Sequence, residues 1–144
     1  MAVNTDQLVR EVIHLAPIIK QQFVRPVDAC FAGKIPPNQM SILNILAKQG
    51  SRTMVQLSKQ ILVCRQQMTQ LVDEMEKKGL ISRALNESDR RSVLIILTDH
   101  GRKRLEEINI ELVEELRNVF EAYTDEQKAS LMANAREIRR IINE

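Results

Sequence analysis

The spacing of apolar residues changes once along this chain, and the change limits the folds open to it. Over most of the sequence, apolar residues recur three or four positions apart, the spacing of helices that bury one face. Two short runs, 80–85 and 93–97, are instead rich in aliphatic and β-branched residues, and the polar segment 86–91 separates them. Such runs predict the two strands of a β-hairpin. We therefore expect a mainly α-helical protein with a small β-hairpin.

Two short helices joined by a tight turn are predicted just before the hairpin. Thr53 and Gln56 have the spacing of a capping box, in which each side chain satisfies a backbone amide of the first helical turn. The turn lies around 62–64, and the next helix covers 65–78 and ends at Gly79. Its inward stripe consists of Met68, Leu71, Val72 and Met75.

Two helices are predicted before this pair. The first begins near Asn4 or Thr5, either of which can cap it. We expect Pro17 and Pro26 to kink or break it, because proline lacks the N–H that a helix interior uses. The second covers 36–50, with prolines in its first turn and glycine at its end.

Two further helices are predicted after the hairpin. Thr98 and Asp99 begin a long one that continues to about Tyr123, and a second capping box at 124–127 opens the last. The long helix has a narrow apolar stripe and densely acidic faces. One small domain does not bury a helix of this kind along its length, so the pattern favours a second chain as its partner.

Composition fits a single globular domain. The chain has 144 residues, 44% of them hydrophobic and 28% charged, and only four aromatic side chains, so the core must be aliphatic. No run approaches the roughly 18 apolar residues of a membrane span, and the N-terminus does not resemble a signal peptide. We therefore expect a cytoplasmic protein without membrane association.

Charge is unevenly distributed along the sequence. Residues 51–104 carry eleven Lys or Arg against six Asp or Glu, whereas residues 105–144 carry five against ten. The basic middle indicates a nucleic-acid-binding face, and the acidic C-terminal part indicates a different role.

Polar side chains on the helix 65–78 are of the types that read DNA. They lie opposite its apolar stripe and near its N-terminus, and they are Arg65, Gln66, Gln67, Thr69 and Gln70. Glutamine bonds adenine through two hydrogen bonds and arginine bonds guanine likewise, each pair worth roughly 1–3 kcal/mol of discrimination. Arg65 is also a candidate phosphate contact. Before the preceding helix, Ser51, Arg52 and Thr53 are candidate phosphate contacts through hydroxyl and amide groups.

The hairpin tip is a second candidate contact. Arg90 and Arg91 are adjacent there, and a guanidinium that projects from a hairpin is attracted to the negative minor groove. Asp89 beside them would repel phosphate, so we expect it to hold an arginine or the turn in place. Arg83, on the strand that leads to the tip, is a weaker phosphate candidate.

The order of these elements and the residues of the hairpin resemble the MarR (multiple antibiotic resistance regulator) family of winged helix-turn-helix transcriptional regulators. Asp89, Arg91, Leu97, Thr98 and Gly101 match the family's wing pattern D-x-R-x(5)-L-T-x-x-G, and residues 57–83 align without gaps to its helix-turn-helix. Two positions depart from the pattern. Leu62 stands where the turn usually has glycine, and Cys64 stands where the recognition helix usually has a serine cap.

The resemblance implies a division of the single domain, 1–144. Residues 37–98 would form the winged helix-turn-helix, and 1–33 with 99–144 would form a helical dimerisation region. It also implies a homodimer that reads a pseudo-palindrome in duplex DNA, commonly as a repressor. Family members often release DNA when a small aromatic anion binds between the two regions. A stacking pocket for such an effector would have to use Phe23, Phe31, Phe120 or Tyr123.

Residues that would indicate catalysis or metal binding are sparse. His14 and His100 have no partner pattern, the four glycines form no phosphate-binding loop, and two cysteines with two histidines lack zinc-site spacing. We expect neither enzyme activity nor a cofactor or metal.

Two other hypotheses remain open from the residues. Cys64 would lie at the positive end of the recognition helix beside Arg65, which favours a thiolate, so Cys64 or Cys30 could serve a thiol-based redox-sensing regulator. The simpler interpretation makes each cysteine a small buried apolar residue. The winged helix could also be a protein-protein interaction module, which the wing arginines and the polar recognition face argue against.

Overall fold

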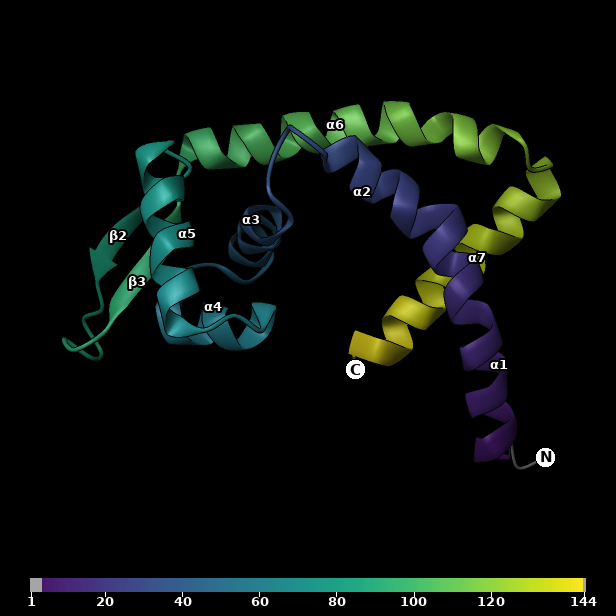
Figure 1. The fold of residues 1–144 in the computed structure, drawn as a ribbon, viewed down its shortest axis with the longest axis horizontal. Helices are drawn as coiled ribbons and strands as arrows, with labels where there is room; N and C mark the ends of the chain where they lie inside the picture. Colours follow the sequence, from purple (N-terminus) through teal and green to yellow (C-terminus); the bar gives the residue numbers. More distant parts are fainter. Residues whose placement is uncertain (1–3, 144) are drawn as a thin grey trace. The chain divides into compact units, whose positions relative to one another are not determined.

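The computed structural model describes residues 4–143, which form two compact units (Figure 1). One unit is Val27–Glu111. The other consists of the described residues up to Pro26 together with those from Leu112 onward. The second boundary between the two units, at 111/112, falls inside one long helix. Only the first turns of that helix contain buried residues.

The unit Val27–Glu111 contains most of α2 (Arg25–Phe31), three complete helices, a small sheet and the first turns of the long helix. After α2 its elements are, in chain order, α3 (Pro37–Gln49), β1 (Arg52–Thr53), α4 (Met54–Ile61), α5 (Arg65–Lys77), β2 (Ile81–Leu85), β3 (Val93–Leu97) and the start of α6 (Asp99–Glu121). The strands are antiparallel in the order β1-β3-β2. This is the helix-turn-helix followed by a hairpin that the sequence predicts.

The core of this unit is aliphatic, as the scarcity of aromatic residues requires. Side chains from α3, α4, α5, the start of α6 and both long strands meet in it, and among the least exposed are Ile42, Leu43, Leu57, Met68, Val72, Met75, Ile95 and Ile108. On α5 the buried residues recur at helical spacing, so one face of α5 packs inward and the other faces solvent.

Strand β1 is the element that the sequence analysis missed. Arg52 pairs with Ile95 and Thr53 with Leu94 on the open edge of β3. A strand of two residues leaves no periodic pattern that could be recognised in the sequence. It forms by pairing with the edge of β3. Thr53 also begins α4, and the expected capping box is confirmed: its hydroxyl accepts the Gln56 amide at 3.2 Å, and the Gln56 side chain accepts the Thr53 amide at 2.9 Å.

The other unit is wholly helical. It contains α1 (Thr5–Ile19), the π-helix η1 (Lys20–Val24), the first residues of α2 (Arg25–Phe31), the later turns of α6, and α7 (Asp125–Asn143). Asn4 caps α1 through the amide of Asp6, 2.9 Å away, and a second capping box joins Thr124 and Gln127. Both caps confirm the sequence prediction. Over residues 4–143, no helix is both long and apolar enough to cross a membrane.

The prolines do not break the first helical segment, so of the kink or break that the sequence predicts, the break is wrong. Helical backbone continues through Pro17, which lies inside α1. Before Pro26 the hydrogen bonding widens, so that the Arg25 amide donates to the Lys20 carbonyl five residues earlier. A π-helical stretch between two prolines accommodates the missing N–H groups by a change of register.

The turn between α4 and α5 is built on an unusual backbone conformation. Leu62 has φ 58° and ψ 45°, and it is the one non-glycine residue with positive φ in the described part of the chain. This conformation lets the amides of Leu62 and Val63 both donate to the Ser58 carbonyl, which closes the turn. The Leu62 side chain is 89% exposed, so packing does not compensate the strain.

The start of α6 docks directly on the segment that joins α5 to β2. The Thr98 hydroxyl donates to the Gly79 carbonyl at 2.6 Å, and the Thr98 amide donates to the Leu80 carbonyl at 3.2 Å. Gly101 lies against the same backbone: a Cβ on it would sit 2.0 Å from the Leu80 oxygen. The Leu-Thr-x-x-Gly part of the wing pattern therefore encodes a contact between two backbone segments.

Gly101→Ala is expected to lower the free energy of unfolding by about 3 kcal/mol, because the new methyl group meets a backbone oxygen with no room to move. Gly33→Ala is the control. Nothing lies within 4 Å of its Cβ position, so only its left-handed φ of 80° costs energy, roughly 1 kcal/mol. Urea unfolding at fixed protein concentration measures both, and equal losses would contradict the proposed contact.

Leu62→Gly is expected to raise the free energy of unfolding by about 0.5–1 kcal/mol, because relief of the left-handed strain exceeds the extra chain entropy of glycine. Leu62→Ala removes the same exposed side chain but keeps the strain, so its stability should stay within about 0.5 kcal/mol of the parent. Thermal unfolding of the three proteins tests this. Equal stabilisation by both substitutions would assign the effect to the side chain instead.

Candidate nucleic-acid interface

Helix α5 presents a polar face to solvent along its N-terminal half. Its inward side chains, Met68, Val72 and Met75, are 0% exposed, which fixes the opposite face outward. All five residues predicted to read or hold DNA from this helix are exposed: Arg65, Gln66, Gln67, Thr69 and Gln70. The helix therefore offers donors and acceptors on the side that its packing leaves open.

Two of these five side chains also serve the helix itself. The side-chain oxygen of Gln67 accepts a hydrogen bond from the Cys64 backbone amide at 3.3 Å, and the Thr69 hydroxyl donates to the Arg65 backbone carbonyl at 3.0 Å. Within the described residues, Gln66 and Gln70 make no side-chain hydrogen bond, and their amides remain available to a ligand. Gln67 keeps its NH₂ group but has its oxygen engaged in a cap.

The segment before α4 holds the other predicted phosphate contacts. Ser51 is exposed, and the Arg52 guanidinium donates to the Ser51 carbonyl at 2.8 Å and to the Gln49 side chain at 3.3 Å. The Thr53 hydroxyl accepts the Gln56 amide as part of the cap, and its hydrogen stays free to donate. Arg52 therefore lies in the extended strand β1, just before α4, and two hydrogen bonds hold its guanidinium group there.

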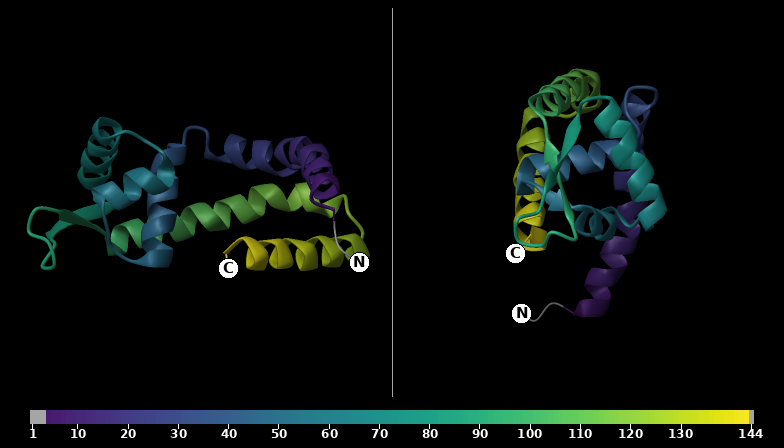
Figure 2. Two further views of the ribbon diagram at one scale, coloured as in Figure 1. Left: turned by 90° about the horizontal axis from the view of Figure 1, so that it is seen from below. Right: turned by 90° about the vertical axis from the view of Figure 1, so that its left-hand side faces the viewer.

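The tip of the β2–β3 hairpin, the wing, extends beyond the helices of its unit (Figure 2). The Asp89 carboxylate accepts the Arg91 amide at 3.0 Å and lies 3.8 Å from the Arg91 guanidinium, the restraining role expected for it. The Asn86 side chain bonds the Ser88 amide and the Ser92 hydroxyl. The Arg91 side chain is 97% exposed, and Arg90 is exposed beside it. The turn is thus held from inside while both guanidinium groups face solvent.

Arg83 joins the wing to α5. Its guanidinium bonds Asp73 at 2.5 Å and also bonds Glu76, so one strand residue bridges two carboxylates one turn apart on the helix. The hydrogen bond to Asp73 raises the pKa of Arg83, with smaller contributions from the charge of Glu76. With its charge compensated, Arg83 acts as a brace, and its assignment as a phosphate contact stays a prediction. Sequence reasoning missed the brace, because Arg83 and Asp73 lie on different elements.

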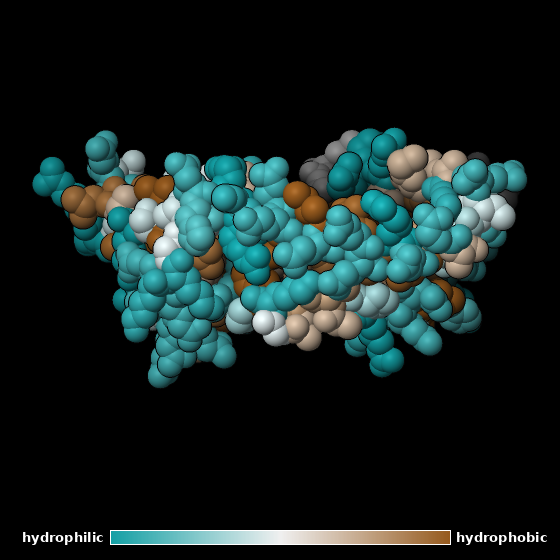
Figure 3. All heavy atoms as spheres, turned by 90° about the horizontal axis from the view of Figure 1, so that it is seen from above, coloured by the Kyte–Doolittle hydropathy of each residue, from teal (hydrophilic) through white to brown (hydrophobic). Residues whose placement is uncertain are grey.

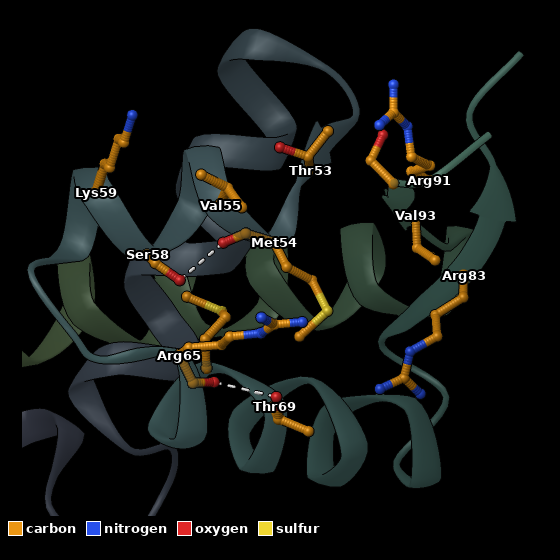
Figure 4. A pocket seen from close by; sticks show the side chains of 12 residues that line it. Thr53, Met54, Val55, Ser58, Lys59, Arg65, Thr69, Arg83, Arg91 and Val93 are labelled. Atoms are coloured by element: carbon orange, nitrogen blue, oxygen red, sulfur yellow. Dashed lines mark hydrogen bonds between the residues drawn. The ribbon is translucent and has the colours of Figure 1, made fainter. Parts of the chain in front are cut away.

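A basic hollow lies between α4, α5 and the base of the wing (Figure 4). Met54, Val55 and Val93 give it apolar walls, and no carboxylate lines it. The cationic side chains at its edge are Lys59, Arg65 and Arg91, together with Arg83, whose charge Asp73 and Glu76 compensate. Such a surface suits an anion, either a backbone phosphate or a small apolar molecule with a negative group. Lys59 was missed by the sequence analysis, although it belongs to the basic surplus of residues 51–104.

The two cysteines of the redox hypothesis differ in solvent exposure. Cys64 is exposed at the N-cap of α5, and Cys30 is partly buried in α2. Neither cysteine is part of a disulfide. No hydrogen bond or ion pair of Arg65 with Cys64 is present among the described residues, so the thiol-based hypothesis gains no support beyond the location of Cys64.

Comparison with known proteins points to one family. The model of the MarR family matches residues 35–93, which cover α3 through the start of β3. The HTH-type transcriptional regulator YsmB of Bacillus subtilis is 35% identical over 131 residues, which is 88% of this chain and 88% of that protein.

Solved structures agree over nearly the whole chain. A MarR family protein from Bacillus stearothermophilus has a TM-score of 0.75 at 26% identity and covers 99% of this chain and 100% of its own. A mutant of MarR from E. coli complexed with operator DNA has a TM-score of 0.63 at 20% identity and covers 94% of this chain and 99% of its own. The second likeness concerns the fold alone.

Arg83→Met is expected to lower the free energy of unfolding by about 1 kcal/mol, since two partly exposed ion pairs are lost and solvent screens both. Hydrogen exchange of the β2 amides should become faster. Arg90→Met removes the same charge from a side chain without an ion pair in the described chain and should leave both measurements unchanged. If the two variants behaved identically, Arg83 would not stabilise the wing through Asp73 and Glu76.

Proposed function

We propose that this chain, which belongs to the MarR family of transcriptional regulators, binds specific operator sequences in duplex DNA as a homodimer. In this proposal α5 enters the major groove and reads base edges, the wing arginines enter the adjacent minor groove, and the segment before α4 holds phosphate. The unit that reads DNA corresponds to residues 37–98, and the helices of 1–33 and 99–144 join the two chains.

One observation carries the DNA-binding part. Arg65, Gln66 and Gln70 lie exposed on the N-terminal half of α5 without internal partners, while the opposite face of the helix is fully buried. A helix with exposed amides and a guanidinium near its N-terminus can present paired donors and acceptors to base edges. Arg90 and Arg91, both exposed at the wing, supply the charge that a groove with negative potential attracts.

The exposed apolar side chains of the helical unit support the proposed homodimer. In the unit of residues 4–26 and 112–143, no side chain described there is buried, and large apolar residues stay exposed on each helix. Among them are Leu8 at 54%, Ile13 at 62%, Val113 at 63% and Ile141 at 58%. Helices with apolar faces and no buried side chain need further cover, and a second copy supplies it with two-fold symmetry. A dimer of DNA-reading units implies a pseudo-palindromic operator.

Repression and release by a small molecule complete the proposal. A dimer that occupies an operator overlapping a promoter blocks transcription by exclusion. The basic, apolar-walled hollow lined by Arg65 and Arg91 suits a small apolar anion, and an occupant there would compete with phosphate for the same guanidinium groups. In the helical unit, Phe23 and Phe120 already stack on each other at 5.4 Å, which leaves less aromatic surface for a ligand.

The test is fluorescence anisotropy with duplexes that tile the DNA upstream of the gene, beside a shuffled duplex, across a salt series. We expect one duplex to bind at least about 10³-fold more tightly than the shuffled one. Arg90→Ala/Arg91→Ala should weaken binding and reduce the log–log salt slope by about 2, since each cation releases roughly one counterion. Sedimentation of the complex should give two chains per duplex.

Arg136→Ala/Arg139→Ala is the matched control for charge, because it removes two exposed arginines of α7 and leaves the wing intact, and sedimentation of the free variant checks that it is still a dimer. It should bind as the parent does. A folded dimer without affinity for any duplex at low salt would sink the DNA proposal and favour the protein-binding module. Equal losses for both double variants would assign the effect to net charge alone.

A further inference from the structure

Gln39 is the one buried polar side chain among the described residues. It lies in the first turn of α3 and is 0% exposed, beside the buried Met40. Helix α3 is not part of the predicted DNA-contacting surface. A fully buried amide costs free energy unless both its groups are hydrogen-bonded, so its presence in an aliphatic core requires a reason.

Both groups of the Gln39 amide are bonded to one helix. The NH₂ group donates to the Glu74 carboxylate at 2.9 Å, and the carbonyl oxygen accepts the Lys78 ammonium at 3.1 Å. Chemistry fixes the orientation of the amide, because a carboxylate only accepts and an ammonium only donates. Glu74 and Lys78 are four residues apart, so they lie one above the other on the same face of the α5 helix and its C-cap.

Two bonds to positions one turn apart constrain a helix more than one bond does. A single contact allows the helix to pivot around it, whereas two contacts spaced along the axis fix both the rotation about the axis and the translation along it. Rotation of α5 by 20° moves a Cβ by about 1 Å, since side chains leave a cylinder of roughly 2.3 Å radius, and a shift of this size breaks hydrogen bonds. Apolar packing by Met68 and Met75 tolerates such a shift better.

We propose that Gln39 is a positioning residue for α5, and that it sets the rotational phase at which Gln66 and Gln70 are presented. The inference rests on the proposed function, because phase matters for recognition only if α5 reads base edges. Gln39 touches no DNA in this account. It acts through Glu74 and Lys78, and therefore determines discrimination between sequences rather than general affinity for phosphate.

The first variant is Gln39→Met, which keeps the length of the side chain and removes both hydrogen bonds. The probe is the tightest duplex from the tiling experiment beside the shuffled duplex. We expect the ratio of the two affinities to fall about fivefold, the lower end of what one paired base contact contributes, with shuffled binding changed less than about twofold. Gln60→Met is the matched control, since Gln60 is exposed and bonds only the side chain of Gln49. It should leave the ratio unchanged.

An exchange of partners separates positioning from packing. Gln39→Glu alone keeps an acceptor for Lys78 but sets a carboxylate against Glu74, so the affinity ratio should fall further. The double variant Gln39→Glu/Glu74→Gln restores both bonds with the amide and the carboxylate exchanged, and the ratio should recover. If Gln39 only filled space, the double variant would not recover the affinity ratio.

Hydrogen exchange of the free protein supplies a readout without DNA. Gln39→Met should speed exchange of the α5 amides after the first turn, while α4 amides stay as in the parent. An unchanged affinity ratio, an absent rescue or unchanged α5 exchange would each overturn the inference. If the parent itself fails to discriminate any duplex, the proposed function fails, and the exchange result alone decides whether Gln39 positions α5.

Discussion

The contact of Thr98 and Gly101 with the backbone of Gly79 and Leu80 is the constraint on which the unit Val27–Glu111 depends. Four elements meet there, because α5 ends, β2 begins, β3 ends and α6 begins within these few residues. The Thr98 hydroxyl is shared, donating to the Gly79 carbonyl and accepting the Gly101 amide at 2.9 Å. Hydrogen bonds at such a junction fix directions as well as distances, so the wing and the recognition helix leave it at set angles.

From this junction, α5 is held on two further sides by polar contacts. Arg83 bonds Asp73 and Glu76 from the wing, and Gln39 bonds Glu74 and Lys78 from α3. These partners cluster in the C-terminal half of α5 and at its C-cap, whereas the side chains proposed to read DNA lie in the N-terminal half. The side chains that are proposed to read DNA and the side chains that hold α5 in place therefore lie on different halves of the helix.

The outline of the fold is predictable from the sequence because it rests on local signals. Capping boxes at Thr53 and Thr124, the glycine ends of helices and the change of apolar period each involve residues a few positions apart. Two of the missed features depend on distant partners. Strand β1 needs the edge of β3, and the amide of Gln39 is bonded to Glu74 and Lys78, which lie 35 and 39 residues away in the sequence. The π-helical stretch before Pro26 was missed for a different reason, since a break and a change of register both accommodate the same missing N–H.

The helical unit raises a separate point about how the protein folds. With no buried side chain described in residues 4–26 and 112–143, its apolar faces contribute little stability until something covers them. The face seen in Figure 3 is largely hydrophilic, with apolar side chains exposed at several places on it. If a second chain covers the apolar faces, folding of these helices is coupled to assembly, and their stability rises with protein concentration. The unit Val27–Glu111, which has its own buried core, carries no such requirement. In the proposed dimer, the one long helix α6 would pass from a part stabilised within the chain to a part whose stability depends on association.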